Sequence, residues 1–162
     1  MDNEKSVWDR LSASYLIYAQ ALKDFFTQDV DRISLMKDSL IGQDRIIAIH
    51  LLQYLAPSEH LQLFNELVYL SSFSHGSIEA VRQVILSMPR DWVLANIEQS
   101  VEPLLKNGTY DEYRRLLELF VELDPEITLN LAQRAKKHED SDIREVGIDF
   151  IHKLDKSQHT GK

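Results

Sequence analysis

Cysteine is absent from the 162 residues, and there are only five glycines and four prolines. The lack of cysteine excludes a disulfide framework, a thiolate zinc site and a cysteine nucleophile. So few glycines and prolines leave little room for the many turns of a β-sandwich or barrel, which favours helices. No stretch approaches the ~18–20 apolar residues that a membrane span needs.

Positive charge is also in short supply, since 18 basic residues stand against 26 acidic ones, a formal net charge of −8. This balance disfavours binding to nucleic acid or to an anionic membrane. The polar start of the chain, Met1 to Lys5, lacks the apolar run of a signal peptide. We therefore expect a cytoplasmic protein with no nucleic-acid or membrane partner.

The usual catalytic and metal-binding motifs are missing as well. The chain has no Gly-rich phosphate loop, no Gly-x-Ser-x-Gly and no His-Glu-x-x-His. Its densest group of potential ligands, His138 to Asp140 with Asp142, lies at a predicted turn, where such residues favour the helix dipole without a metal. Two i, i+4 pairs are expected on solvated helix faces: Asp111 with Arg115, and Glu118 with Glu122. We expect no catalytic residue, no metal and no cofactor, and therefore no enzyme.

What the chain does contain is a repeat. Three glycines and one serine each stand five residues before a large apolar residue: Gly42, Gly76, Gly108 and Ser141 before Ile47, Val81, Tyr113 and Val146. The apolar residues recur after 34, 32 and 33 positions. A fixed period in this range indicates stacked helical repeats, and such solenoids bind other macromolecules over extended surfaces.

Each repeat is predicted to be a helix, a short turn and a second helix. The first helices carry apolar stripes: Ile47, Leu51, Leu52 and Leu55; Val81, Ile85 and Met88; Tyr113, Leu117 and Phe120; Val146, Phe150 and Leu154. Prolines mark the breaks, and the expected caps of the second helices are Ser58, Asp91 and Asp124. Pro103 predicts a kink or break near Gln99–Glu102.

The predicted second helices keep the same register. Their apolar columns are Phe64, Ile97 and Leu131, and Val68, Val101 and Ala135, with spacings of 33 and 34 residues. All of these residues are expected in the core, together with Ile47, Leu51, Val81, Ile85, Leu117 and Phe150. The alternative is an irregular helical bundle whose helices merely have similar lengths.

The N-terminal region departs from the repeat. An apolar stripe predicts a long helix over residues 6–26: Trp8, Leu11, Tyr15, Ala19, Leu22 and Phe26. Val30, Ile33 and Leu40 predict a shorter one after it. We interpret residues 1–40 as an atypical N-terminal cap unit of a single repeat domain, 1–155, because terminal repeats present one polar outer face. Residues 156–162 are expected to be a flexible tail.

Two segments resemble the first helix of a HEAT-type repeat, namely residues 141–154 and residues 77–86. Each has a capped start and an adjoining valine and arginine. The resemblance covers about residues 41–154, although the period is shorter than the ~40–47 residues of HEAT and armadillo units. Arg82 and Arg114 align, whereas Ala48 and Gly147 take the corresponding places in the other units. The resemblance implies an all-α, right-handed superhelix of about four units, whose second helices line a concave face.

Some HEAT-like proteins are DNA glycosylases that use a basic face with aromatic and acidic residues. Asp91 beside Trp92 is the one comparable pair here, and we interpret it as a cap followed by a buried ring. The basic residues Arg134, Lys136 and Lys137, with Arg144 nearby, could form an anion site. The simpler interpretation is a helix C-terminus, where basic side chains meet the dipole.

The outward positions of the second helices are the predicted binding surface. Two positions along a helix is about 200° of rotation, so residues between the apolar columns point away from the core. These are Glu66, Tyr69, Asn96, Gln99, Glu102, Asn130, Gln133 and Lys136, and Leu63 stands in register with Asn96 and Asn130. We expect a non-catalytic interaction module or scaffold that binds a protein or peptide along this face. The alternatives are an accessory subunit of an enzyme complex, a nucleic-acid-processing HEAT-like enzyme, or an adaptor that completes its stack as a homodimer.

Overall fold

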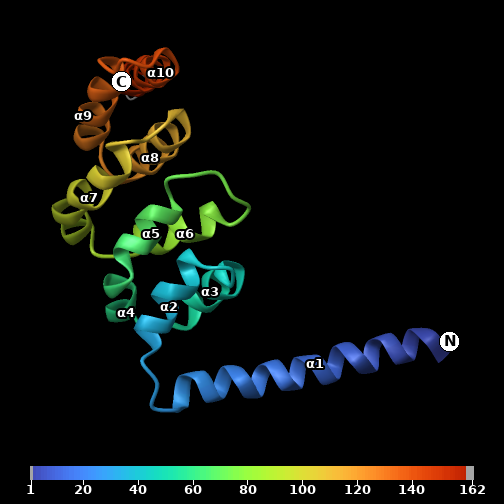
Figure 1. The fold of residues 1–162 in the computed structure, drawn as a ribbon. Helices are drawn as coiled ribbons and strands as arrows, with labels where there is room; N and C mark the ends of the chain where they lie inside the picture. The colour runs from blue at the N-terminus through green and yellow to red at the C-terminus, as the bar shows by residue number, and fades with distance from the viewer. Residues whose placement is uncertain (1, 160–162) are drawn as a thin grey trace. The chain divides into compact units, whose positions relative to one another are not determined.

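The protein is all-α: the computed structural model describes residues 2–159, and none of them lies in a strand. Figure 1 shows the order of the helices along the chain. The α-helices are α1 (Asp2–Thr27), α2 (Arg32–Ile41), α3 (Arg45–Leu51), α4 (Pro57–Gln62), α5 (Phe64–Leu70), α6 (Ile78–Leu86), α7 (Arg90–Leu105), α8 (Tyr110–Leu123), α9 (Pro125–Lys136) and α10 (Ser141–His159), and a 3-10 helix, η1, covers Leu52–Tyr54. The helical composition predicted from the scarcity of glycine and proline is confirmed.

The chain divides into two compact units, one ending at Leu35 and one beginning at Met36. The first contains α1, which matches the predicted N-terminal helix and extends it in both directions. Trp8, Leu11 and Tyr15 of the predicted stripe are exposed, whereas Leu22 is half-buried. Of the predicted tail, residues 156–159 belong to α10, and residues 160–162 lie outside the described part of the chain.

In the second unit, three buried columns run through the first helices of the repeats. They are Ala48, Val81, Tyr113 and Val146; Leu52, Ile85, Leu117 and Phe150; and Leu55, Met88 and Phe120. Within each column the spacings are 33, then 32, then 33 residues. The burial predicted for Val81, Ile85, Leu117 and Phe150 is confirmed, because apolar side chains one period apart stack into one core.

The first repeat is shifted by one residue from the predicted register. Ile47 is 57% exposed and Leu51 is only half-buried, so their predicted burial was wrong. The cause is the turn after α2: Gly42 lies six residues before the buried Ala48, whereas Gly76 lies five before Val81. One additional turn residue rotates α3 by about 100°, which moves Ile47 out of the core.

The second helices follow the predicted register throughout. Every member of the two columns is buried: Phe64, Ile97 and Leu131, and Val68, Val101 and Ala135. In the first repeat this helix is divided into α4 and α5 at Leu63, which is itself fully buried, so the prediction that Leu63 points outward was wrong. The helix α7 runs through Pro103 without the predicted break.

The starts of the second helices differ from two of the three predicted caps. The carboxylate of Asp124 caps α9 as predicted, accepting from the backbone N–H groups of Glu126 at 2.8 Å and Ile127 at 3.4 Å. In α4, however, Pro57 is already the first helical residue, and the Glu59 carboxylate accepts from the Ala56 N–H instead of Ser58 acting as the cap. Asp91 lies inside the first turn of α7, which begins at Arg90. Proline at the first position suits a helix start because its missing N–H is not needed there.

Polar contacts join residues about one period apart. Arg82 on α6 donates to the Arg115 carbonyl at 2.7 Å and to the Glu118 carboxylate at 3.0 Å, both on α8. Asp111, at the start of α8, accepts from the backbone N–H and the hydroxyl of Ser74, each at 2.9 Å. The prediction that Asp111, Arg115 and Glu118 form merely solvated faces was therefore wrong, because these side chains connect neighbouring repeats.

A further close approach occurs between α9 and α10. Gly147 is buried, and a Cβ atom placed on it would lie 2.5 Å from the Ala132 carbonyl oxygen and against the Lys136 nitrogen. Backbone atoms cannot move aside as a flexible side chain can. The small residue of the HEAT-like segment is therefore required for this packing.

Candidate partner-binding surface

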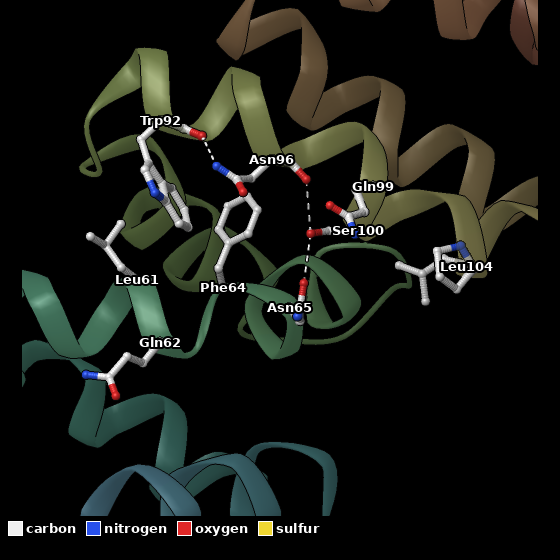
Figure 2. A pocket seen from close by; sticks show the side chains of 10 residues that line it. Leu61, Gln62, Phe64, Asn65, Trp92, Asn96, Gln99, Ser100 and Leu104 are labelled. Carbon is white, nitrogen blue, oxygen red and sulfur yellow. Dashed lines mark hydrogen bonds between the residues drawn. The ribbon is translucent and has the colours of Figure 1, made fainter.

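A hollow of about 510 Å³ lies between the α4–α5 segment and α7 in the second unit. Figure 2 shows it from close by. Its lining is apolar or neutral and polar, with no titratable side chain: Leu61, Gln62, Phe64, Asn65, Trp92, Asn96, Gln99, Ser100, Pro103 and Leu104. A concave site with apolar walls and a few polar groups is the usual form of a binding pocket. We call it the α5–α7 hollow.

Two aromatic rings form one wall of the hollow. Phe64 and Trp92 meet edge to face, with ring centroids 5.0 Å apart and an interplanar angle of 77°. Phe64 is buried and Trp92 is half-buried, so the indole closes the core and also presents surface to the hollow. Tyrosine and tryptophan in such positions supply large, rigid contact areas for a partner.

Amide and hydroxyl groups lie across the hollow from one another. The Ser100 hydroxyl is 2.8 Å from Asn65 Oδ1 and 3.2 Å from the Asn96 carbonyl oxygen, which ties α5 to α7. Asn96 Nδ2 donates to the Trp92 carbonyl at 2.7 Å. These bonds fix the amides and leave the Asn65 Nδ2 and the Asn96 Oδ1 to offer a donor and an acceptor to a bound segment.

The amides also follow the repeat. Gln62 and Asn65 are three residues apart, as are Asn96 and Gln99, and as are Asn130 and Gln133; each pair comes 34 residues after the last. We call these six residues the amide ladder. All six are exposed except the half-buried Asn96, and the first four line the α5–α7 hollow.

A smaller hollow of about 210 Å³ lies between α7, α8 and α9, and its lining includes Glu98, Glu102, Asn130 and Arg134. Glu102 and Arg134 form a two-pronged ion pair with N–O distances of 2.5 and 3.0 Å. The hydrogen bond from Arg134 holds the pKa of the Glu102 carboxyl below its ordinary value. This hollow therefore has a charged, already paired rim, unlike the neutral α5–α7 hollow.

The predicted surface residues do not all come together. Asn96 and Gln99 line the larger hollow, Glu102 and Asn130 line the smaller one, and Glu66, Tyr69, Gln133 and Lys136 line neither. Gln99, Glu102, Asn130, Gln133 and Lys136 are exposed as predicted, whereas Glu66, Tyr69 and Asn96 are half-buried. The Tyr69 ring packs against Phe73, with centroids 5.2 Å apart. The partial burial of Tyr69 makes it a weaker anchor than the sequence suggests.

Four lining residues were missed from the sequence: Gln62, Asn65, Ser100 and Trp92 had no predicted role in binding. The 34-residue recurrence of the amide pairs was visible and could have indicated the first two. Trp92 was assigned to the core alone, which its half-burial contradicts in part. Ser100 carries no sequence signal, since only the packing of α5 against α7 brings it to Asn65.

The other candidate sites have local structural roles. Arg144 donates to the His138 and Glu139 carbonyls at 3.0 and 2.6 Å, and Arg134 is paired with Glu102, as the helix-terminus interpretation expects for basic side chains near carbonyls and carboxylates. The Asp140 carboxylate caps α10, accepting from Asp142 at 2.8 Å. Within residues 2–159, no group of three or more His, Asp or Glu side chains is placed to hold a metal ion.

Comparisons with known proteins give no assignment. No protein-family model matches the chain. No curated protein is significantly similar to it, and no solved structure is either. Over the described residues, none of the helices is both long enough and apolar enough to cross a lipid bilayer.

Proposed function

We propose that the unit from Met36 onward is a HEAT-like stack of about four helical hairpins, and that it acts as a non-catalytic module binding a segment of a protein partner. The observation that carries the binding proposal is the α5–α7 hollow, with an aromatic wall and a ladder of neutral amides. Support for a stack comes from the buried columns and from contacts that join α6 to α8, α8 to α10 and α5 to α7. Such contacts, between each helix and its counterpart one repeat later, are typical of solenoids.

The lining of the hollow favours an extended peptide segment. Each amide offers both a donor and an acceptor, which matches the alternating N–H and C=O groups of an extended backbone. The Phe64–Trp92 wall suits one apolar side chain of that segment. The absence of a titratable group from the lining argues for binding over acid–base chemistry at this site.

Affinity capture from the native host with two matched variants tests the proposal. The hollow variant carries Asn65→Arg and Gln99→Arg, both at exposed lining positions, so added bulk and charge fill the hollow without entering the core. The control variant carries Gln43→Arg and Asn107→Arg, at exposed turn positions outside the hollow, with the same change in charge. A partner retained by the wild type and the control but lost by the hollow variant supports the proposal. Equal retention by all three would place the binding surface elsewhere.

A further inference from the structure

The helix α1 carries a heptad pattern. Six apolar or aromatic residues follow one another at spacings of three, four, three, four and three: Trp8, Leu11, Tyr15, Tyr18, Leu22 and Phe25. We call this set the α1 seam. Alternating steps of three and four place all six along one line of a slightly underwound helix, the pattern of helices that pack lengthwise against another helix.

The N-terminal half of the seam is solvent-exposed. Trp8 and Tyr15 are each 66% exposed and Leu11 is 61% exposed. Monomeric proteins rarely leave so many large apolar side chains in a row exposed to water. The exposure therefore indicates an interaction surface along α1.

The residues beside the seam suit pairing with an identical helix. The flanking positions in the middle of α1 are Ser12, Ser14, Ala19 and Ala21, which are small and uncharged. Charged residues at such positions set partner choice in coiled coils, and like charges there oppose self-pairing. With four acidic and three basic residues, α1 has a net charge of −1, although the whole chain carries −8. Two copies of α1 can thus approach with little electrostatic repulsion.

We infer that two copies of this chain associate through their α1 seams. The 26 residues of α1 form a helix of about 39 Å. If each of the six seam residues buries roughly 100 Å², two copies bury on the order of 1,200 Å², the lower end of stable interfaces. A lipid surface fits less well, because interfacial helices are rich in lysine and arginine, and α1 has three such residues against four acidic ones.

Molar-mass measurement on the full chain tests the inference. Light scattering or sedimentation over about 1–200 µM should show the wild type approaching the mass of two 18.8 kDa chains as concentration rises. The seam variant, Leu11→Glu with Tyr15→Glu, should keep the mass of one chain. The control, Ser6→Glu with Ala13→Glu, adds the same charge to α1 at exposed positions off the seam and should associate like the wild type. A wild type of single-chain mass throughout, or a seam variant that still associates, overturns the inference.

Tryptophan fluorescence gives a second measurement that does not depend on a disruptive variant. Trp8 and Trp92 are the only two tryptophans, so Trp92→Phe leaves Trp8 as the sole reporter. Its emission should shift to shorter wavelength as concentration rises, because the indole leaves water when the seams pair. An emission maximum independent of concentration contradicts the inference. A shift that appears only on adding anionic vesicles also contradicts it, and would assign the seam to a membrane surface.

Discussion

The later helices, α6 to α10, and the earlier helices of the second unit, α2 to α5, use the same repeat with different regularity. In α8 and α9 the helices have 14 and 12 residues, whereas α3, α4 and α5 have seven, six and seven. The apolar residues also lie differently, since Val81 and Tyr113 are buried and Ile46 and Ile47 are 78% and 57% exposed.

Polar contacts account for much of this difference. The start of α8 is fixed by Thr109, whose hydroxyl and N–H both donate to the Glu112 carboxylate, at 2.6 and 2.7 Å. Arg82 connects α6 to α8, but one period earlier the corresponding residue is Ile49, which has no hydrogen-bonding side chain. Buried columns set the position of a repeat, and caps with side-chain ties set where its helices begin and end. The four predictions below test this difference, from the largest expected effect to the smallest.

Truncating one isoleucine in each region should have opposite consequences. Ile85→Ala removes a fully buried side chain of α6 and should cost about 2–5 kcal/mol of the free energy of unfolding. Ile47→Ala, in the exposed face of α3, should stay within about 0.5 kcal/mol. Chemical denaturation of both variants measures the two values. Comparable losses would restore the original register, in which Ile47 belongs to the core.

Two glycine substitutions should separate packing from turn formation. Gly147→Ala forces a methyl group against the backbone of α9 and should destabilise the fold by about 3 kcal/mol, as severe overpacking does. Gly76→Ala, in the turn before α6, meets no atom within 4 Å and should change stability little. Thermal unfolding of the pair is sufficient. A neutral Gly147→Ala would mean that α9 and α10 are not in close contact in solution.

Removing the two aligned arginines should have unequal effects. Arg82→Gln breaks a 3.0 Å pair whose arginine side chain is 7% exposed, and should cost about 1–2 kcal/mol. Arg114→Gln breaks a 3.4 Å pair to the half-exposed Asp149, and should cost less than about 1 kcal/mol. Urea midpoints compared at equal slope measure both. An equal or reversed order would show that the Arg82 contact does not stabilise the link between α6 and α8.

The contact between the Ser74 loop and α8 should give a small acid dependence. Burial raises the pKa of the Asp111 carboxyl, but hydrogen bonds from Ser74 and Arg115 outweigh it, so the pKa lies below its ordinary value. A lowered pKa in the folded state means that this stabilisation is present above the unfolded pKa of about 4 and is lost as pH falls through the folded value. Asp111→Asn should therefore destabilise by about 1 kcal/mol or less at pH 7 and show a smaller acid loss than the wild type. Parallel acid dependences would exclude this contribution.

The sequence predicts the period and the later core well, because both depend on side chains whose burial follows helical spacing. It fails at Ile47 because the length of the turn after Gly42 decides the rotation of α3, and turn length is not encoded in the apolar spacing. It also fails at Asp111, since its contact with Ser74 joins residues 37 positions apart. The hollow was found only in part: the amide ladder is visible in the sequence, whereas the half-burial of Trp92 results from how α7 packs on α5.

Peptide selection against the isolated chain tests the central claim about the α5–α7 hollow most directly. A random display library is selected on the wild type, and the recovered peptides are titrated against the Asn65→Arg/Gln99→Arg and Gln43→Arg/Asn107→Arg variants. The account predicts peptides that share an apolar residue, bind the wild type and the turn control alike, and lose at least about tenfold in affinity, or 1.4 kcal/mol, for the hollow variant. Peptides that bind all three proteins equally would contradict it.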